Sequence, residues 1–300
     1  ARSGMGGRKG EPLPVATGRG ERKPSILRTI LLVFCIILFC PLTGIPGILA
    51  LVFAPVFGLC AVQTFTWRCA VCFFRILLWA AGCSYTVVGM ENLDENKTYF
   101  FCCNHESHFD VPLIFSTLPF WLISIAKKSL MYIPVFGWAV AAGGTVWIDR
   151  KNTEKALNSM GSAEKSLRKR PRSVIVFPEG TRSRDGKLQP FKKGGVILAI
   201  QTGMPVVPVC VHNTLNVVEK GGRWVTPQPL TVCVGKPIPT DKLTFEDRDK
   251  LVKQLEDAVT ELKQKAPLYS GRNSKPEPFW HCFLRTPPPS AKTAWGRVPP

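Results

Sequence analysis

A histidine and an aspartate that follow an apolar strand could together form a catalytic base. The motif NHESHFD places His105 and Asp110 five residues apart, directly after the apolar run YFFCC. On a regular helix, five residues correspond to about 500° of rotation, so the two side chains would point to different faces. They can meet only if His105 lies in a loop and Asp110 in the first helical turn, where Pro112 is also tolerated. A carboxylate bonded to one imidazole nitrogen leaves the other nitrogen free to accept a hydroxyl proton.

Two other interpretations of this motif are open. Ser107 and Asp110 have the spacing of a helix capping box, although Pro112 would then stand where its missing N–H matters. His105, His108 and Asp110 could instead bind a metal ion. Two histidines and one carboxylate are a weak metal pattern without further ligands, so we expect no metal.

Two further predicted strands end in arginine. Arg150 follows GGTVWID, and the motif FPEGTRS places Glu179, Gly180, Thr181 and Arg182 after the apolar run SVIVF. The planar fork of arginine suits phosphate oxygens, and a glycine lets a ligand approach the backbone closely. An ionised glutamate only accepts hydrogen bonds, so Glu179 would orient a guanidinium or receive a substrate hydroxyl. These groups together would suit an anionic ligand that carries hydroxyls.

The positive charge of the chain is concentrated in its tails and in one internal segment. The formal net charge is +18, and residues 165–193 hold ten basic residues against two acidic ones. Such a segment attracts phosphate, an anionic membrane or nucleic acid. Aromatic residues do not alternate with the basic ones and no zinc-finger or RNP signature occurs, so we expect no nucleic-acid partner. Residues 165–172 could also be an ordinary solvated helix face.

The eleven cysteines do not resemble a disulfide framework, because several of them lie inside apolar runs. A buried free cysteine behaves as a small hydrophobic residue, and this pattern favours a reducing compartment. Cys69 and Cys72 have redox or metal spacing but no second pair. Cys102 or Cys103 could be the nucleophile of a thioesterase with His105, although residues so close in sequence form such a pair with difficulty.

The N-terminal quarter of the chain has the character of a membrane segment. Residues 1–24 are rich in Gly, Pro and Arg and are predicted to be a disordered basic tail, and no charged residue occurs between Thr29 and Gln63. A helix needs about 20 apolar residues to cross a bilayer, and proline and glycine at residues 41–47 interrupt this run. We therefore expect residues 25–82 to form helices embedded in, or lying on, a membrane. The preceding basic residues favour an active site that faces the cytoplasm.

From residue 83 to residue 266 short strand and helix patterns alternate, which predicts an α/β domain with a mostly parallel sheet flanked by helices. Residues 267–300 form a Pro-rich tail. The predicted strands are residues 85–88, 99–103, 121–126, 145–148, 174–177, 206–211 and 230–234. The predicted helices are residues 108–118, 129–142, 153–169, 192–202 and 246–265. The functional groups of such a sheet gather at the carboxyl ends of its strands.

The chain resembles the glycerolipid acyltransferase family, which has a His-x-x-x-x-Asp motif. NHESHFD is similar to the first block of that family, GGTVWIDR to the second, FPEGTRS to the third and MPVVPV (residues 204–209) to the fourth. The four blocks occur in the same order and at similar spacing over roughly residues 85–240. The third block most resembles the 1-acylglycerol-3-phosphate acyltransferase branch.

This resemblance implies an O-acyltransferase of phospholipid biosynthesis. Its co-substrate would be acyl-CoA or an acyl-carrier protein, and it would convert lysophosphatidic acid to phosphatidic acid at the sn-2 hydroxyl, with no resident cofactor. His105 and Asp110 would be catalytic, whereas Arg150, Glu179, Gly180, Thr181 and Arg182 would bind the substrate. The alternatives are acylation of another lysophospholipid, or a non-enzymatic membrane protein that binds anionic lipids through its basic segment.

Overall fold

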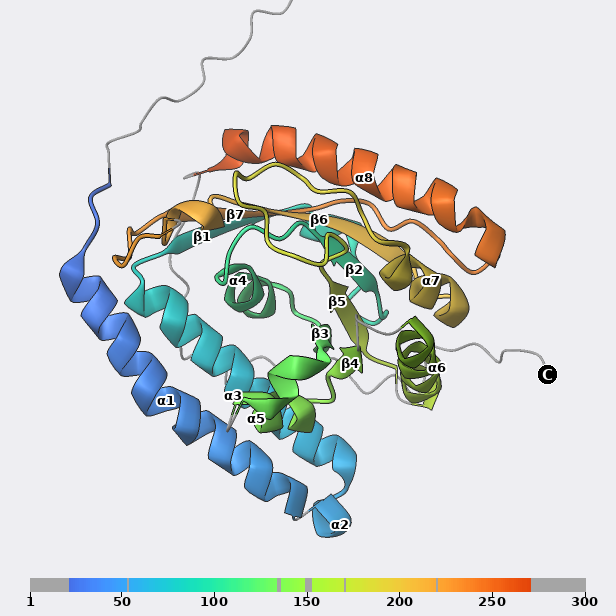
Figure 1. The fold of residues 1–300 in the computed structure, drawn as a ribbon, viewed down its shortest axis with the longest axis horizontal. Helices are drawn as coiled ribbons and strands as arrows, with labels where there is room; N and C mark the ends of the chain where they lie inside the picture. Colours follow the sequence, from blue (N-terminus) through green and yellow to red (C-terminus); the bar gives the residue numbers. More distant parts are fainter. Residues whose placement is uncertain are drawn as a thin grey trace, which may run out of the picture.

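A seven-stranded sheet forms the centre of the molecule (Figure 1). The computed structural model describes residues 22–52, 54–133, 136–148, 153–169, 171–219 and 221–270. Across the sheet the strand order is β1-β7-β6-β2-β5-β3-β4. The strands are β1 (Ser84–Val88), β2 (Phe100–Cys103), β3 (Leu122–Lys127), β4 (Val146–Ile148), β5 (Ser173–Val176), β6 (Val206–His212) and β7 (Pro229–Val234).

The sheet is parallel except between β6 and β7, which confirms the predicted fold class. β2 lies between β6 and β5, with Phe101 paired to Val207 on one side and to Ile175 on the other. Because these three strands run in the same direction, their carboxyl ends meet at one edge of the sheet. The residues that follow β2, β5 and β6 are therefore brought together, although they are far apart in sequence.

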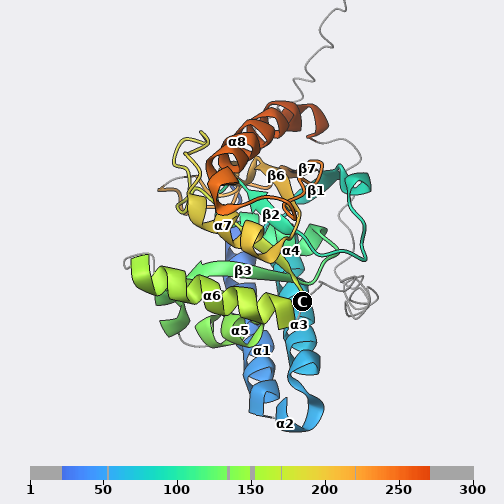
Figure 2. The ribbon, with the colours of Figure 1, turned by 90° about the vertical axis from the view of Figure 1, so that its right-hand side faces the viewer.

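Helices cover both faces of the sheet, as Figures 1 and 2 show. They are α1 (Ile26–Val52), α2 (Ala54–Phe57), α3 (Leu59–Ala80), α4 (Asp110–Thr117), α5 (Phe136–Ala142), α6 (Thr153–Lys169), α7 (Lys193–Thr202) and α8 (Arg248–Lys265). Short 3₁₀ helices are η1 (Met90–Asn92), η2 (Lys128–Tyr132), η3 (Thr214–Asn216), η4 (Phe245–Asp247) and η5 (Ala266–Tyr269).

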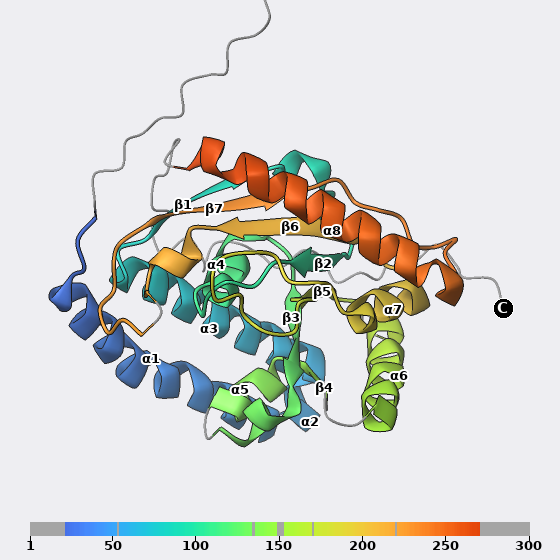
Figure 3. The ribbon, with the colours of Figure 1, turned by 45° about the horizontal axis from the view of Figure 1, so that its top comes forward.

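Side chains of β2 alternate between the two halves of the core, as expected for a strand buried on both faces. Phe101 and Cys103 join the cluster under α1, α3 and α4. Phe100 and Cys102 join the cluster under α6, α7 and α8. α8 lies along the outer surface of β6 and β7 (Figure 3), which brings a residue of the C-terminal helix close to the end of β2.

All seven predicted strands occur within one or two residues of their expected bounds, but one predicted helix and the predicted start of the tail need correction. The helix predicted over residues 129–142 is divided into η2 and α5, with Pro134 between them in the sequence. A proline lacks the N–H that a continuous helix would need there. Residues 267–269 of the predicted tail lie in η5, and residues 1–21 and 271–300 lie outside the described part of the chain.

The N-terminal helices pack against the α/β domain rather than standing apart from it. α1 continues through Pro41 and Pro46, where an interruption was expected, and its packing against α3 and α5 offsets the missing hydrogen bonds. Leu32 and Cys35 of α1 and Leu78 of α3 belong to the same core cluster as the sheet. Within the described residues, no helix combines the length and apolar character that a membrane crossing requires.

Candidate functional site

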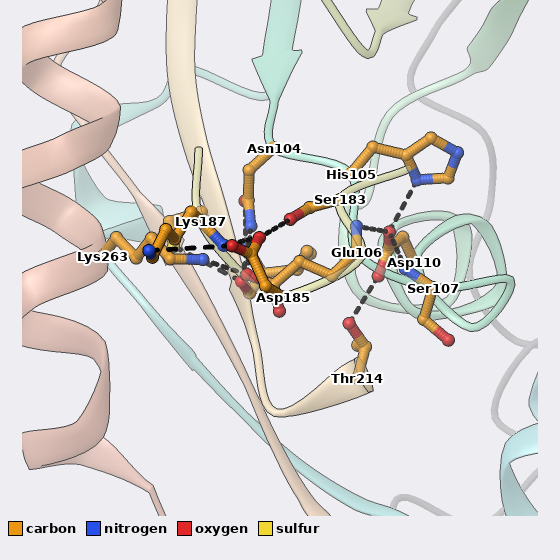
Figure 4. Close-up of polar contacts among 12 residues, drawn as sticks. Asn104, His105, Glu106, Ser107, Asp110, Ser183, Asp185, Lys187, Thr214 and Lys263 are labelled. Carbon is orange, nitrogen blue, oxygen red and sulfur yellow. Dashed lines mark hydrogen bonds and ion pairs between the residues drawn. The ribbon is translucent and has the colours of Figure 1, made fainter. Parts of the chain in front are cut away.

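His105 and Asp110 meet at the carboxyl end of β2. The Nδ1 atom of His105 lies 2.7 Å from Oδ2 of Asp110, and Figure 4 shows the second ring nitrogen turned away from the carboxylate. His105 is in the loop after β2, and Asp110 is the first residue of α4. The imidazole stacks on Phe177, with ring centroids 4.2 Å apart. This is the arrangement that the spacing of the two residues required.

The carboxylate of Asp110 is fully buried and accepts several hydrogen bonds. Oδ2 also accepts the backbone N–H groups of Glu106 at 2.7 Å and Ser107 at 2.8 Å, and Oδ1 accepts the hydroxyl of Thr214 at 2.6 Å. The N-cap residue of α4 is Phe109, which makes no side-chain cap hydrogen bond, so Ser107 and Asp110 do not form the capping box that their spacing allows. Asp110 instead binds the loop before α4 and orients His105 at the same time.

The loop after β5 holds the backbone of His105 on both sides. Oε1 of Glu179 accepts the N–H of His105 at 2.6 Å, and the N–H of Ser183 donates to the carbonyl of His105 at 2.7 Å. Oε2 of Glu179 accepts the N–H of Gln189 at 2.8 Å, and the side chain is buried. Both oxygens of Glu179 thus bind the protein backbone, and its role in binding substrate stays a prediction.

A second buried network holds the other side of the loop that carries His105. The Asn104 side chain bonds both backbone groups of Val211 on β6, and its Nδ2 also donates to Oε1 of Glu106 at 3.1 Å. Lys263 reaches from α8 to form an ion pair with the same carboxylate oxygen (Figure 4). The sequence gives no sign of this ion pair, because the two partners are 157 residues apart.

Burial changes the pKa values of three ionisable groups near His105. It raises the pKa of Glu106, an effect opposed by the charge and hydrogen bond of Lys263. It also raises the pKa of Glu179, opposed by the backbone N–H groups of Gln189 and His105. Burial and the nearby charge of Arg182 lower the pKa of His108. These two effects favour the neutral form of His108.

The predicted substrate-binding residues other than Glu179 lie at the rim of the site or outside the described residues. Thr181 and Arg182 are exposed, immediately before the residue that bonds the carbonyl of His105. Gly180 has a φ of +72°, a backbone conformation in which a side chain is strained, so this turn favours glycine. Arg150 lies outside the described residues.

The basic segment is not one continuous cationic face. Arg168 pairs with Glu164 and donates to the carbonyl of Gln201, and Arg172 is buried with a hydrogen bond to Ser166. These two arginines therefore stabilise the packing of α6. The other described basic residues of the segment belong to three elements: α6 (Lys165, Lys169), the loop after β5 (Arg182, Arg184, Lys187, Lys192) and the start of α7 (Lys193).

The cysteines next to His105 are poorly suited to nucleophilic catalysis. Cys102 and Cys103 are fully buried in the core, and burial raises the pKa of both thiols well above the usual range. A thiol that does not ionise is a weak nucleophile. Cys69 is free whereas Cys72 is disulfide-bonded, so CxxC does not act as a pair and the expectation of free cysteines throughout needs correction.

No group of three or more potential ligands placed to hold a metal ion occurs in the described part of the chain. The arrangement around His105 offers proton transfer instead. It has an oriented imidazole, a buried carboxylate behind it and arginine at the rim.

Comparisons with known proteins identify the same region. The acyltransferase family model matches residues 84–212. The chain is 34% identical over 197 residues to a 1-acyl-sn-glycerol-3-phosphate acyltransferase of Saccharomyces cerevisiae, covering 65% of each protein. It is 38% identical over 167 residues to the protein of the same name from Cocos nucifera, covering 56% of this chain and 54% of the relative. The chain thus spans less than two thirds of the length of either relative.

A solved structure extends the similarity to the fold. The crystal structure of the 1-acyl-sn-glycerophosphate (LPA) acyltransferase PlsC from Thermotoga maritima matches with a TM-score of 0.66 and 26% identity. The match covers 79% of this chain and 93% of that one. Residues 84–212, which carry the His105–Asp110 pair, therefore match the acyltransferase family model, and the two curated relatives named above are 1-acyl-sn-glycerol-3-phosphate acyltransferases.

Proposed function

We propose that this protein transfers a fatty acyl group from acyl-CoA or an acyl-carrier protein to the sn-2 hydroxyl of lysophosphatidic acid, giving phosphatidic acid. The observation that carries the proposal is the 2.7 Å contact between His105 and the buried carboxylate of Asp110. The names of the relatives support the choice of acceptor. An imidazole oriented in this way is suited to removing the proton from a hydroxyl.

In the proposed reaction, Nε2 of His105 takes the proton of the sn-2 hydroxyl while its oxygen attacks the thioester carbonyl. The C–O bond forms and a tetrahedral oxyanion results. The C–S bond then breaks, and the leaving thiolate takes the proton back from the imidazolium. Asp110 keeps Nδ1 protonated throughout and stabilises the positive charge that develops on the ring, without accepting the proton itself.

Arg182 is the described residue best placed to bind the phosphate of the acceptor. It is exposed, and it is close enough to His108 for its charge to lower the pKa of that imidazole. His108 is three residues from the proposed base. Arginine binds phosphate with two parallel hydrogen bonds, which lysine cannot reproduce. Arg150 remains a predicted second phosphate ligand.

A panel of acceptors tests this proposal. Purified protein with labelled acyl-CoA should acylate lysophosphatidic acid and give little product with lysophosphatidylcholine, whose phosphate is capped by choline. Arg182→Ala should raise the KM for lysophosphatidic acid about 10-fold or more, as expected for the loss of a charged hydrogen bond. Arg168→Ala, on α6 and paired with Glu164, is the matched control and should leave this KM unchanged.

Two outcomes would contradict the acceptor assignment. Product from lysophosphatidylcholine alone would show that the protein acylates another lysophospholipid. Equal effects of the two arginine substitutions on KM would show that Arg182 does not bind the phosphate. A third result, hydrolysis of the acyl thioester without acceptor, would instead support the thioesterase alternative.

We also propose that the protein lies on a membrane through α1, η2 and α5. Large apolar side chains of these elements are exposed, among them Leu27, Ile30 and Phe34 on α1, and α5 packs against α1. Tyr132 and Trp138 add exposed aromatic rings, a residue type enriched at membrane interfaces. An apolar surface of this kind typically contacts a membrane or another protein. A surface that enters one leaflet would deliver a lipid acceptor to the site, which we expect on the cytoplasmic side.

Co-sedimentation with phosphatidylglycerol–phosphatidylcholine vesicles tests this surface. Replacing Leu27, Ile30 and Phe34 together with glutamate should lower vesicle binding about 10-fold or more, because each charge would have to enter the apolar layer. The control is Lys165→Glu with Lys169→Glu on α6, which covers the opposite face of the sheet. If the α6 variant loses binding while the α1 variant keeps it, the basic segment is the lipid-binding surface and the proposed orientation is wrong.

A further inference from the structure

The hydroxyl of Thr214 contacts the oxygen of Asp110 that does not face His105. Thr214 is the first residue of η3, at the carboxyl end of β6, and is fully buried. Its Oγ1 donates to Oδ1 of Asp110 at 2.6 Å (Figure 4). Thr214 lies just beyond residues 84–212, which the family model matches.

The hydrogen bonds of Asp110 are divided unequally between its two oxygens. Oδ2 accepts from Nδ1 of His105 and from two backbone N–H groups. Among the described residues, Oδ1 accepts only from Thr214. Rotation about the last side-chain torsion of aspartate is soft, so the donor on Oδ1 fixes the plane in which Oδ2 faces the imidazole.

The backbone before Thr214 adopts a conformation that is unfavourable for most residues. Asn213 has a φ of +71° and is the single non-glycine residue with positive φ in the described part of the chain. Asparagine tolerates this region better than most residues. Its side chain donates to the carbonyl of Pro229 at 3.0 Å and accepts from Nδ2 of Asn216 at 2.6 Å. A backbone outlier that its surroundings maintain is often found next to a functional group, and here the turn directs Thr214 towards Asp110.

We propose that Thr214 is a positioning residue for the proposed acyl transfer: its hydroxyl holds the Asp110 carboxylate in the plane that aligns His105. The inference rests on the proposed function. The same bond withdraws electron density from the carboxylate and so moderates its attraction for the imidazolium proton. Thr214 thus influences both the direction and the basicity of His105, without touching substrate.

Thr214→Val and Thr214→Ser test this role as a matched pair. Valine keeps the shape and removes the hydroxyl, whereas serine keeps the hydroxyl. Thr214→Val should lower kcat about 10-fold with little change in KM, in the range seen when a group behind a catalytic ligand is removed. Thr214→Ser should recover most of kcat. Thr202→Val is the control, because Thr202 is equally buried but donates only to backbone carbonyls on α7.

The pH dependence of kcat separates positioning from a purely structural role. In Thr214→Val the carboxylate loses a donor and holds the imidazolium proton more strongly, so the acid limb of the pH–rate profile should move to higher pH. Thr214→Ser and Thr202→Val should keep the wild-type profile. All these proteins share the other charged or titratable groups near the pair, which are Cys103, Glu106, His108, Glu179, Arg182, Cys210 and Lys263.

The result that overturns the inference is a Thr214→Val protein with a lower melting temperature but wild-type kcat and pH profile. Serine and valine variants with the same loss of kcat would overturn it too, because the hydroxyl would then be irrelevant. Failure of the proposed function itself is distinguishable, since it appears as wild-type turnover in a protein that lacks the His105 imidazole.

Discussion

Replacing His105 with alanine should lower kcat about 10²–10⁴-fold, the usual contribution of a general base. The backbone bonds from His105 to Glu179 and Ser183 do not involve the imidazole, so the loop should keep its conformation. Loss of the contact with Phe177 removes about 1 kcal/mol of stacking, too little to unfold the domain. Kinetics at saturating acyl-CoA, with a melting curve for each protein, measure both effects.

His108→Ala is the matched control for this experiment. His108 lies three residues further along the chain, and no carboxylate bonds its ring among the described residues. Its pKa is lowered by burial and by the charge of Arg182, which disfavours the charged imidazolium that would attract a phosphate. We expect a change in kcat of less than about 10-fold. The assignment of the base fails if His108→Ala is the inactive protein and His105→Ala retains turnover.

The second large effect is expected from Lys263→Met on α8. This substitution leaves the carboxylate of Glu106 buried without its cation, with only the amide of Asn104 as a side-chain donor. Removing one partner of a buried ion pair is strongly destabilising, but Lys263 is 25% exposed and water screens part of the interaction. We therefore expect a loss of about 1–3 kcal/mol in the free energy of unfolding at pH 8, measured by urea denaturation.

The loss should depend on pH in a definite direction. Burial raises the pKa of Glu106 in the folded protein, and Lys263 opposes this shift. In Lys263→Met the folded pKa rises further, so the folded state binds a proton that the unfolded state has already released. The stability contribution of this group is complete below the unfolded carboxyl pKa of about 4.3 and falls as pH rises through the raised folded value. The variant should therefore come closer to wild type at pH 5 than at pH 8.

Glu106→Gln combined with Lys263→Met completes the test. The double variant buries no unpaired charge and should be more stable than Lys263→Met alone, because replacing both partners is milder than removing one. A double variant as unstable as the sum of the single variants would show that Lys263 acts through packing of its stem instead. Equal loss at pH 5 and pH 8 would contradict the electrostatic explanation as well.

The sequence predicts the sheet well because its strands are short β-branched and aromatic runs that end at clear turn residues. The pairing of His105 with Asp110 could also be predicted, since only one local geometry lets two residues at that spacing meet. In the sequence, Leu251, Leu255 and Leu262 repeat at helical spacing and leave Lys263 on the polar side of its helix. Periodicity cannot reveal that this side of α8 crosses the end of β2, where Glu106 lies.

The contacts of Glu179 and Thr214 could not be predicted from the sequence either, for two different reasons. A glutamate among arginines at a strand end has the chemistry of a ligand-binding residue, yet both of its oxygens accept backbone N–H groups. Thr214 follows an apolar strand and has no neighbour in sequence that suggests a role. Both contacts depend on β5 and β6 lying on either side of β2, and this order is a property of the sheet topology.

Because β2 lies between β5 and β6, the loop that carries His105 loses its conformational freedom during folding and not during substrate binding. Fixing a residue's backbone costs about 1–2 kcal/mol of conformational entropy. His105 loses this entropy when the chain folds, because both of its peptide groups are hydrogen-bonded to the loop after β5. The proposed base is therefore already ordered before the acceptor binds. The binding energy of the acceptor remains available for bringing its hydroxyl and the thioester together.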